Sequence, residues 1–300
     1  MLVVAPHRAR CEFMADVEKL VVFGVGLLGG SIARAALARG VAREVVGLGR
    51  DAEKLAKAEQ AGIITRSTTD AAVACRDADL IVVCTPVDRI ANHVIEVAKA
   101  CNRPALITDA GSTKGNIVAA LPEPLPGGCR FVGSHPLAGS EKTGAEYATE
   151  DLFVGRTVVL TPTGASQPAD IERLEAFWSA LGALVCRMDV ESHDRALAAT
   201  SHVPHLVAAA LAVATDVGYL ELIAGGWRDC TRIAAADAAL WQPILAANRA
   251  HVLKALDRFE TTLASLRSAI ETGDAAKLAR LLGEAKKIRD SAPTLGIATS

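Results

Sequence analysis

The chain has 300 residues, of which 51% are hydrophobic, and a formal net charge of -2 at pH 7. This length and composition favour one large or two modest hydrophobic cores. Balanced charge and scattered basic residues argue against a nucleic-acid partner. The first residues lack the apolar core of a signal peptide, and apolar runs elsewhere are broken by charges before membrane length. Seven cysteines without a CxxC pair indicate reduced thiols. We therefore expect a cytoplasmic protein with no membrane association.

Residues 1–16 are predicted to form a loosely held leader, and a regular alternation of short apolar and amphipathic stretches follows them. The apolar stretches are "KLVVF", "EVVGLGR", "ADLIVVCTP" and "PALITDAGS". This alternation predicts an α/β fold, a Rossmann-type doubly wound and mostly parallel sheet buried on both faces. "FVGSHP" and "GRTVVLTP" are expected to continue the pattern, and residues 171–189 to add a helix and a strand.

Strand signals stop after Asp189. "ESHDRALAATSHVPHLVAAALAVATDV" predicts a long alanine-rich helix interrupted at Pro204, and the remaining stretches repeat apolar residues at helical spacing. The sequence thus predicts a Rossmann domain over residues 17–189 and an all-helical domain over 190–300. Alanine-rich helices pack closely, so we expect the helical domain to form a homodimer.

The stretch "VVFGVGLLGGS" places Gly24, Gly26 and Gly29 as GxGxxG between a strand and a helix. The first glycine permits a tight turn, the second lets the backbone approach a pyrophosphate, and the third lets helix and strand pack closely. The helix N-terminus offers free N–H groups to the phosphates. An ordinary glycine-rich turn is the alternative. The cofactor-binding residues predicted here are Gly24, Gly26, Leu27, Leu28, Gly29, Arg50, Thr85 and Pro86.

The choice of dinucleotide depends on the end of the second strand. An acidic residue there binds the ribose 2′-hydroxyl of NAD, but "VVGLGRD" has Gly49 followed by Arg50. Glycine leaves room for a 2′-phosphate and arginine can pair with it, which favours NADP over NAD. Asp51 is the competing interpretation, because a shift of one residue would return an acid to the ribose.

Three segments should meet at the C-terminal edge of the sheet, where doubly wound folds bind ligands: "CTPVDR", "TDAGSTKG" and "GSHPLAGSEKTG". Ser112 and His135 lie there. A neutral imidazole held by a serine hydroxyl could take the proton of a substrate alcohol as hydride leaves. A loop histidine that caps a backbone group is the alternative.

Further candidates lie in the helical half. "SHVPH" places His202 and His205 on one helical face, and no acid follows at metalloprotease spacing, so we predict no metal site. "GGWRDCTRIA" carries Arg228, Asp229 and Arg232, and an arginine brought to a site can bind a carboxylate with two hydrogen bonds. A solvated surface arginine is the alternative.

These motifs resemble the prephenate/arogenate dehydrogenase family. "GVGLLGGS", "DAGSTKG", "SHPLAGSEKTG", "SHVPH" and "GGWRDCTRIAAADAALW" occur in the family order between about residues 20 and 290. The resemblance implies an enzyme of tyrosine biosynthesis with a Rossmann domain and a helical dimerisation domain. It implies oxidative decarboxylation of prephenate or arogenate, with hydride transfer to NADP or NAD.

The resemblance also implies roles for single residues. His135 is similar to the catalytic histidine that binds the ring hydroxyl, Ser112 to the serine that orients it, and Arg232 to the arginine that binds the ring carboxylate. The other implied contacts, on the substrate side chain, at the site entrance or in its wall, are His205, His202, Glu141, Asp229 and Trp241.

Two alternatives remain open at this point. A β-hydroxyacid dehydrogenase would need a catalytic lysine where the "SHVPH" helix offers histidines, and a non-catalytic NADP-binding sensor would keep the glycine loop without the chemistry. The sequence does not decide between prephenate and arogenate. No regulatory domain of appreciable size is expected after residue 290, so any inhibition by tyrosine would act at the active site or the dimer interface.

Overall fold

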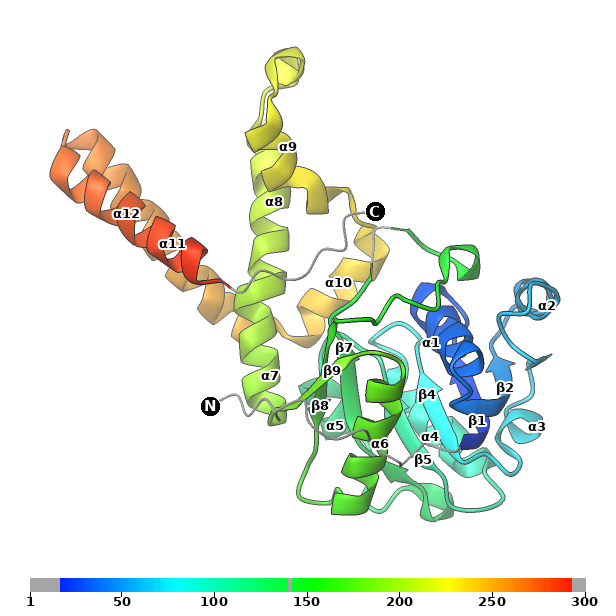
Figure 1. Cartoon of the computed structure of the whole chain (residues 1–300). Helices are drawn as coiled ribbons and strands as arrows, with labels where there is room; N and C mark the ends of the chain where they lie inside the picture. Colours follow the sequence, from blue (N-terminus) through cyan, green and yellow to red (C-terminus); the bar gives the residue numbers. More distant parts are fainter. Residues whose placement is uncertain (1–16, 140–141, 293–300) are drawn as a thin grey trace.

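A computed structural model describes residues 17–139 and 142–292 (Figure 1). The predicted leader at 1–16 lies outside the described residues. Six parallel strands form the main sheet in the order β3-β2-β1-β4-β5-β6, which is the Rossmann order. The strands are β1 (Val17–Phe23), β2 (Ala42–Leu48), β3 (Arg66–Thr68), β4 (Leu80–Val83), β5 (Leu106–Asp109) and β6 (Arg130–Phe131). The connecting helices are α1 (Leu27–Ala38), α2 (Ala52–Gln60), α3 (Ala71–Cys75), α4 (Ile90–Ala100) and α5 (Gly115–Ala120).

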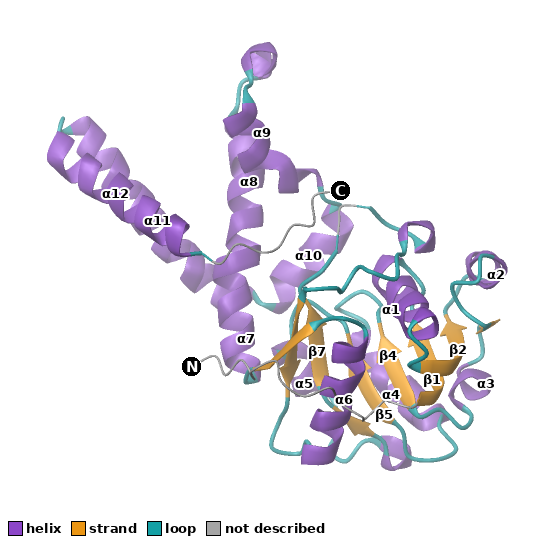
Figure 2. Ribbon diagram, viewed as in Figure 1, coloured by secondary structure: helices purple, strands orange, loops and turns teal. Residues whose placement is uncertain are grey.

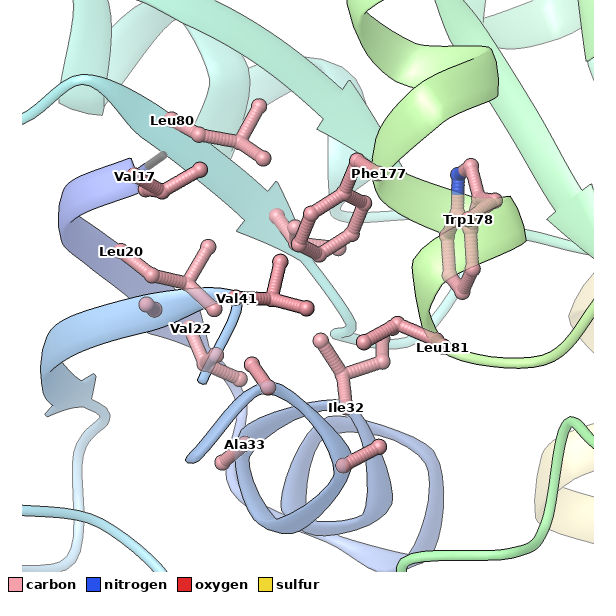
Figure 3. Packing of buried hydrophobic residues seen from close by; sticks show 14 of the residues in the cluster. Val17, Leu20, Val22, Ile32, Ala33, Val41, Leu80, Phe177, Trp178 and Leu181 are labelled. Atoms are coloured by element: carbon pink, nitrogen blue, oxygen red, sulfur yellow. The ribbon is translucent and has the colours of Figure 1, made fainter. Parts of the chain in front are cut away.

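Both faces of this sheet are buried, because successive side chains along each strand point to opposite sides. Leu20 and Val22 of β1 join a cluster with α1 and with α6 (Pro168–Ala180), in which Phe177 and Trp178 are fully buried (Figure 3). Val21 and Phe23 join the opposite cluster with α3 and α4. This two-sided burial explains why the strands appear in the sequence as continuous apolar runs, and it confirms the predicted fold class.

The predicted continuation of the parallel sheet holds only for the start of "FVGSHP", because Phe131 ends β6 and pairs in parallel with β5. From Gly133 on, this stretch and "GRTVVLTP" instead belong to a second sheet of β7 (Gly133–Pro136), β8 (Thr157–Thr161) and β9 (Leu184–Arg187), in which β7 and β8 are antiparallel and β8 and β9 are parallel. Side chains cause the break: the amide of Ser134 donates to Asp109 Oδ1 at 3.1 Å, and Lys114 Nζ donates to the Ser134 carbonyl at 2.8 Å. These side-chain hydrogen bonds take the place of further backbone pairing with β5. The chain continues beyond the carboxyl end of β5 as β7.

The rest of the described chain is helical, as predicted (Figure 2). Its elements are α7 (Val190–Leu197), a π-helical turn η3 (Ala198–His202), α8 (Val203–Ala214), η4 (Val217–Leu222), α9 (Gly225–Thr231), η5 (Arg232–Ala235), α10 (Ala238–Ala247), α11 (Arg249–Glu271) and α12 (Ala275–Ser291). Pro204 does not break the long helix. The preceding π turn, in which Val203 N–H bonds the carbonyl of Ala198, admits the ring and its missing donor.

The combined helix Val190–Ala214 has 25 residues and is long and apolar enough, by length and composition, to cross a membrane. This corrects the expectation that charges interrupt every such run, since residues 197–214 contain no Asp, Glu, Lys or Arg. One helix of this kind is weak evidence for a membrane span, because core and subunit-contact helices have the same composition.

Two helices attach the helical part to the Rossmann part. α7 packs against α5 and β8, and α10 places Ile244 and Trp241 against the cluster on the α3/α4 face of the sheet. By contrast, α11 and α12 form an antiparallel pair that extends away from the sheet (Figure 1).

Candidate active site

The three loop glycines meet three different constraints. Gly24 has φ +99°, and a Cβ there would lie 2.9 Å from the carbonyl oxygen of Cys84. A Cβ at Gly26 would meet nothing within 4 Å, whereas one at Gly29 would overlap the carbonyl of Gly24. Leu27 and Leu28, both half-buried, begin α1, whose first amides have no side-chain cap. This open cradle of free N–H groups fits the pyrophosphate of a dinucleotide.

Around the end of β2, Asp51 is already engaged. Its Oδ1 accepts the Lys54 amide at 3.1 Å as the N-cap of α2, and this hydrogen bond is the main cause of its lowered pKa. Arg50 is exposed. A Cβ at Gly49 would touch only Leu55, at 3.6 Å or more, so packing would accept a larger residue there.

Thr85 and Pro86 follow β4 at the same edge of the sheet. The hydroxyl of Thr85 is 2.8 Å from Nδ1 of His93, and the His93 ring packs on Phe23 with 4.4 Å between centroids. Pro86 is exposed. Both predicted cofactor residues therefore lie on the surface loop that follows β4.

His135 is buried in β7, and its ring is held from α7. Its Nδ1 lies 2.9 Å from Nε2 of His193, and Nδ1 of His193 lies 2.8 Å from Oδ1 of Asp194. Asp194 Oδ1 and Oδ2 also accept the amides of Lys114 and Gly115, at 2.9 and 2.8 Å. His135 therefore ends a continuous hydrogen-bonded chain rooted in the loop after β5.

Sequence reasoning missed His193 and Asp194. In "ESHDRAL" they read as polar residues of an amphipathic helix, and a buried His–Asp pair would have been the only signal. That pair was invisible because its burial comes from the contact of α7 with α5 and β8, elements more than 25 residues away in the chain.

Ser112 is half-buried in the loop after β5, as expected from the motif. Among residues 17–139 and 142–292, no hydrogen bond joins its hydroxyl to His135, whose Nδ1 is bonded to His193 instead. The orienting role of Ser112 stays a prediction.

The charges nearest to the base are paired. Lys114 is fully buried and bonds both Asp109 and the Ser134 carbonyl. Burial lowers the pKa of His135 well below its ordinary value, and the nearby His193, Lys114 and His202 lower it further. His135 is therefore neutral at pH 7, the state in which an imidazole can accept a proton.

His202 ends η3 and His205 lies in the first turn of α8, and both are buried. The Asn248 amide nitrogen donates to the Asp194 carbonyl at 2.7 Å and lies 3.2 Å from Nδ1 of His202. Burial lowers the pKa of His202 to about 4, so the ring is neutral and carries its proton on Nε2. The His205 ring stacks on Trp241, with 3.7 Å between centroids and 6° between planes. Nε2 of His202 and Nδ1 of His205 are buried and have no hydrogen-bond partner among the residues that the structure describes.

The remaining predicted residues lie further out. Arg232 is exposed on η5, which packs against α8, and Asp229 is exposed on α9. Glu141 lies outside the described residues. Within the described chain, no group of three or more His, Cys, Asp or Glu side chains is arranged to hold a metal.

A sheet of Rossmann order, a glycine cradle at a helix start and a buried neutral imidazole at the same edge define a dinucleotide-binding protein with a built-in proton acceptor. Matches to two family models identify the family within this class. The model described as prephenate dehydrogenase, nucleotide-binding domain, matches residues 32–187, and the one described as prephenate dehydrogenase, dimerization domain, matches residues 189–284. The chain belongs to the prephenate dehydrogenase family.

Known relatives agree with this assignment. Prephenate dehydrogenase of Bacillus subtilis is 32% identical over 283 residues, covering 92% of this chain and 76% of that protein. The Aquifex aeolicus prephenate dehydrogenase in complex with hydroxyphenyl propionate and NAD+ is 33% identical with a TM-score of 0.82, covering 91% of this chain and 97% of that one. The arogenate dehydrogenase of Synechocystis is 28% identical with a TM-score of 0.78, covering 91% and 99%.

The neutral buried histidines predict a loss of stability in mild acid. Burial lowers the pKa of His135 and of His202 in the folded chain, so the unfolded chain binds protons first as the pH falls below the ordinary histidine value near 6.5. Between pH 7.5 and 5.5 we expect these two residues to reduce the free energy of unfolding by about 2 to 3 kcal/mol. Urea unfolding at fixed protein concentration measures this difference in the free energy of unfolding. Between the two pH values, the His202→Asn variant should lose less free energy of unfolding than the unaltered chain. Equal free energies of unfolding at pH 7.5 and 5.5 would contradict the neutral state assigned to these histidines.

Proposed function

We propose that the protein catalyses the oxidative decarboxylation of prephenate, arogenate or both, forming 4-hydroxyphenylpyruvate or tyrosine in tyrosine biosynthesis. The observation that carries this proposal is His135. It is a buried, neutral imidazole at the carboxyl edge of the sheet, where the glycine cradle also lies, and its Nε2 has no hydrogen-bond partner among the described residues. Membership of the prephenate dehydrogenase family supports the reaction class.

The proposed role of His135 is to hold one proton through the reaction. The nicotinamide, when bound, supplies the hydride acceptor. His135 Nε2 takes the proton of the ring hydroxyl as hydride leaves the carbinol carbon. The bond from the ring to the carboxylate then breaks, CO2 departs, the electron pair completes the aromatic ring, and His135 returns its proton to the phenolate oxygen. Aromatisation drives the step, so the protein has mainly to position the ring and move this proton.

Substrate contacts follow from the unsatisfied groups on the helical side. Nε2 of His202 is a neutral donor, and it and Nδ1 of His205 have no partner within the described part of the chain, so both can bond the polar side chain of the substrate. We assign the ring carboxylate to Arg232, a wall to Trp241, the orientation of His135 to Ser112, and the entrance to Glu141 and Asp229. A buried polar group left unpaired costs about 1 to 3 kcal/mol, so a ligand that satisfies these atoms gains affinity.

Cofactor preference is assigned to NADP. Its support is the absence of an acid at Gly49, the exposed Arg50 beside it, and the engagement of Asp51 as a helix cap. The related Aquifex aeolicus structure contains NAD+, which is a property of that protein.

We further propose two domains, 17–189 and 190–300, and a cytoplasmic homodimer formed by the second. Large apolar side chains are exposed on the helical part, among them Val213 at 88%, Val217 at 78% and Leu222 at 80%. A second copy would cover them, and the matching family model is described as a dimerization domain.

Replacing the base and the carboxylate ligand should have different kinetic effects. His135→Asn removes proton transfer, so we expect kcat to fall by about 10²- to 10⁴-fold with little change in KM. Arg232→Ala should mainly raise KM. Steady-state kinetics of both variants at pH 7.5 measures this, and an unchanged kcat in His135→Asn would remove the base assignment.

An acid at the end of β2 should reverse the cofactor preference. Gly49→Asp fits sterically and would repel a 2′-phosphate, so we expect kcat/KM with NADP to fall by roughly 10- to 100-fold while that with NAD holds or rises. Arg50→Ala should weaken NADP alone. The exposed Lys57→Ala on α2 is the matched control, with neither value changed. A higher kcat/KM with NAD than with NADP in the unaltered chain would contradict the proposal.

The reaction itself is tested with both substrates and both cofactors. We expect an absorbance rise at 340 nm with arogenate and with prephenate, and the larger kcat/KM with arogenate and NADP. A protein that binds NADPH but gives no rise with either substrate would instead be a sensor, and a rise with a β-hydroxyacid alone would indicate the other class of dehydrogenase.

A further inference from the structure

The contacts of His135 raise a question that the reaction scheme leaves open: which of its two ring nitrogens carries the proton before substrate binds. A neutral imidazole has one donor nitrogen and one acceptor nitrogen. Only the form with an unprotonated Nε2 can accept the hydroxyl proton of the substrate. The hydrogen-bonded chain through His193 and Asp194 determines which nitrogen of His135 carries the proton.

Asp194 is the fixed end of the chain. Burial alone would raise its pKa, but hydrogen bonds from His193 and from the amides of Gly115 and Lys114 outweigh burial and the pKa is lowered. The carboxylate is ionised and can only accept. Because Nδ1 of His193 lies 2.8 Å from Oδ1, that nitrogen must be the donor.

The remaining protons follow from this first one. When the His193 ring carries one proton, held on Nδ1 by Asp194, its lone pair is on Nε2, which lies 2.9 Å from Nδ1 of His135. Nδ1 of His135 must therefore donate, and its own lone pair remains on Nε2. The three residues of this chain are buried, each no more than 8% exposed: His135, His193 and Asp194. Bulk water therefore offers few competing hydrogen-bond partners that would favour the other tautomer.

Within residues 17–139 and 142–292, the other charged groups near this hydrogen-bonded chain do not supply an alternative partner. Lys114, from the start of α5, is bonded to Asp109 and to the Ser134 carbonyl, and His202 is neutral and bonded to Asn248. Asn248 begins α11 with an uncharged amide. β8 contributes "TVVLT", which has no titratable side chain. Asp194 is thus the anion that faces the two rings.

From this geometry we infer that His193 and Asp194 are positioning residues that hold His135 in the Nδ1–H tautomer and stabilise the positive charge it acquires. When the substrate O–H bond breaks and an N–H bond forms at Nε2, the imidazolium keeps its Nδ1–H bond to His193. The developing charge is then next to a ring polarised by a buried carboxylate, as in other carboxylate-oriented histidine bases. This inference rests on the proposed function for its kinetic consequences, but not for the tautomer.

The sharpest variant is Asp194→Asn. The amide NH2 can donate to Nδ1 of His193, which would move the His193 proton to Nε2 and force the His135 proton to its own Nε2. We expect kcat to fall by about 10²- to 10⁴-fold near neutral pH, with KM changed by less than about threefold, as expected when a base is in the wrong tautomer. His193→Gln keeps an acceptor near His135 without the link to Asp194. It should lose less activity and shift the acid limb of the kcat/KM profile to lower pH, because the imidazolium loses its stabilisation.

Asp189→Asn is the matched control. Asp189 is exposed at the N-cap of the same helix, α7, where its side chain accepts the Ser192 amide, and asparagine caps helices equally well. We expect unchanged kcat and an unchanged pH profile. Thermal unfolding and NADPH binding of each variant separate misfolding from lost chemistry.

A measurement without substrate tests the tautomer directly. In protein labelled with 15N-histidine, long-range proton–nitrogen NMR spectra report which ring nitrogen is protonated, and His135→Asn assigns the signal. We expect His135 as Nδ1–H in the unaltered chain and as Nε2–H in Asp194→Asn. An Nε2–H form in the unaltered chain, or full kcat in a folded Asp194→Asn variant, would overturn the inference. If neither substrate is oxidised at all, the proposed function fails while the NMR result still decides the tautomer.

Discussion

The active arrangement depends on one buried carboxylate. Asp194 belongs to the first helix of the helical part, yet both its oxygens accept amides from the loop that follows β5 of the Rossmann sheet. Its remaining bond runs through His193 to His135 on β7. One ionised side chain therefore fastens the helical part to the sheet edge and, through His193, holds the ring of His135. Removing a partner from a buried ionic network typically costs several kcal/mol, so the junction is stable only when it is fully formed.

A second buried charge shapes the strand that carries the base. Lys114 has no exposed surface and bonds Asp109 and the Ser134 carbonyl, while Asp109 accepts the Ser134 amide. These side chains take the place of backbone partners at the point where β6 gives way to β7. The parallel ladder stops there, and His135 leaves the main sheet for an antiparallel pairing with β8. The ion pair between Lys114 and Asp109 thus replaces the backbone partners that a neighbouring strand would provide. It places the imidazole of His135 at the carboxyl edge of the sheet, where the dinucleotide cradle lies.

The helical part contributes neutral donors and acceptors rather than charge. Burial keeps His202 and His205 uncharged, Asn248 sets which nitrogen of His202 carries the proton, and Trp241 supports the His205 ring. Trp241 also packs on the core beneath the sheet, so the same residue supports His205 and joins the two halves. The proposed substrate contacts on this side are therefore neutral groups that recognise polar atoms by direction, with the exposed Arg232 as the proposed cation.

Much of this protein was predictable from local pattern. Continuous apolar runs predicted strands buried on both faces, and the spacing of three glycines predicted the cradle: Gly24, Gly26 and Gly29. The order of the motifs indicated the family. These features were predictable because each depends on residues close together in the chain. The second sheet, the unbroken helix through Pro204, and the partners of His135 were decided only by tertiary structure. His193 and Asp194 lie 58 and 59 residues beyond His135, and nothing in their local pattern distinguishes a solvated helix face from a buried relay. Burial and hydrogen-bond direction are properties of the packed interface between α7, α5 and β7, and they exist only once that interface has formed.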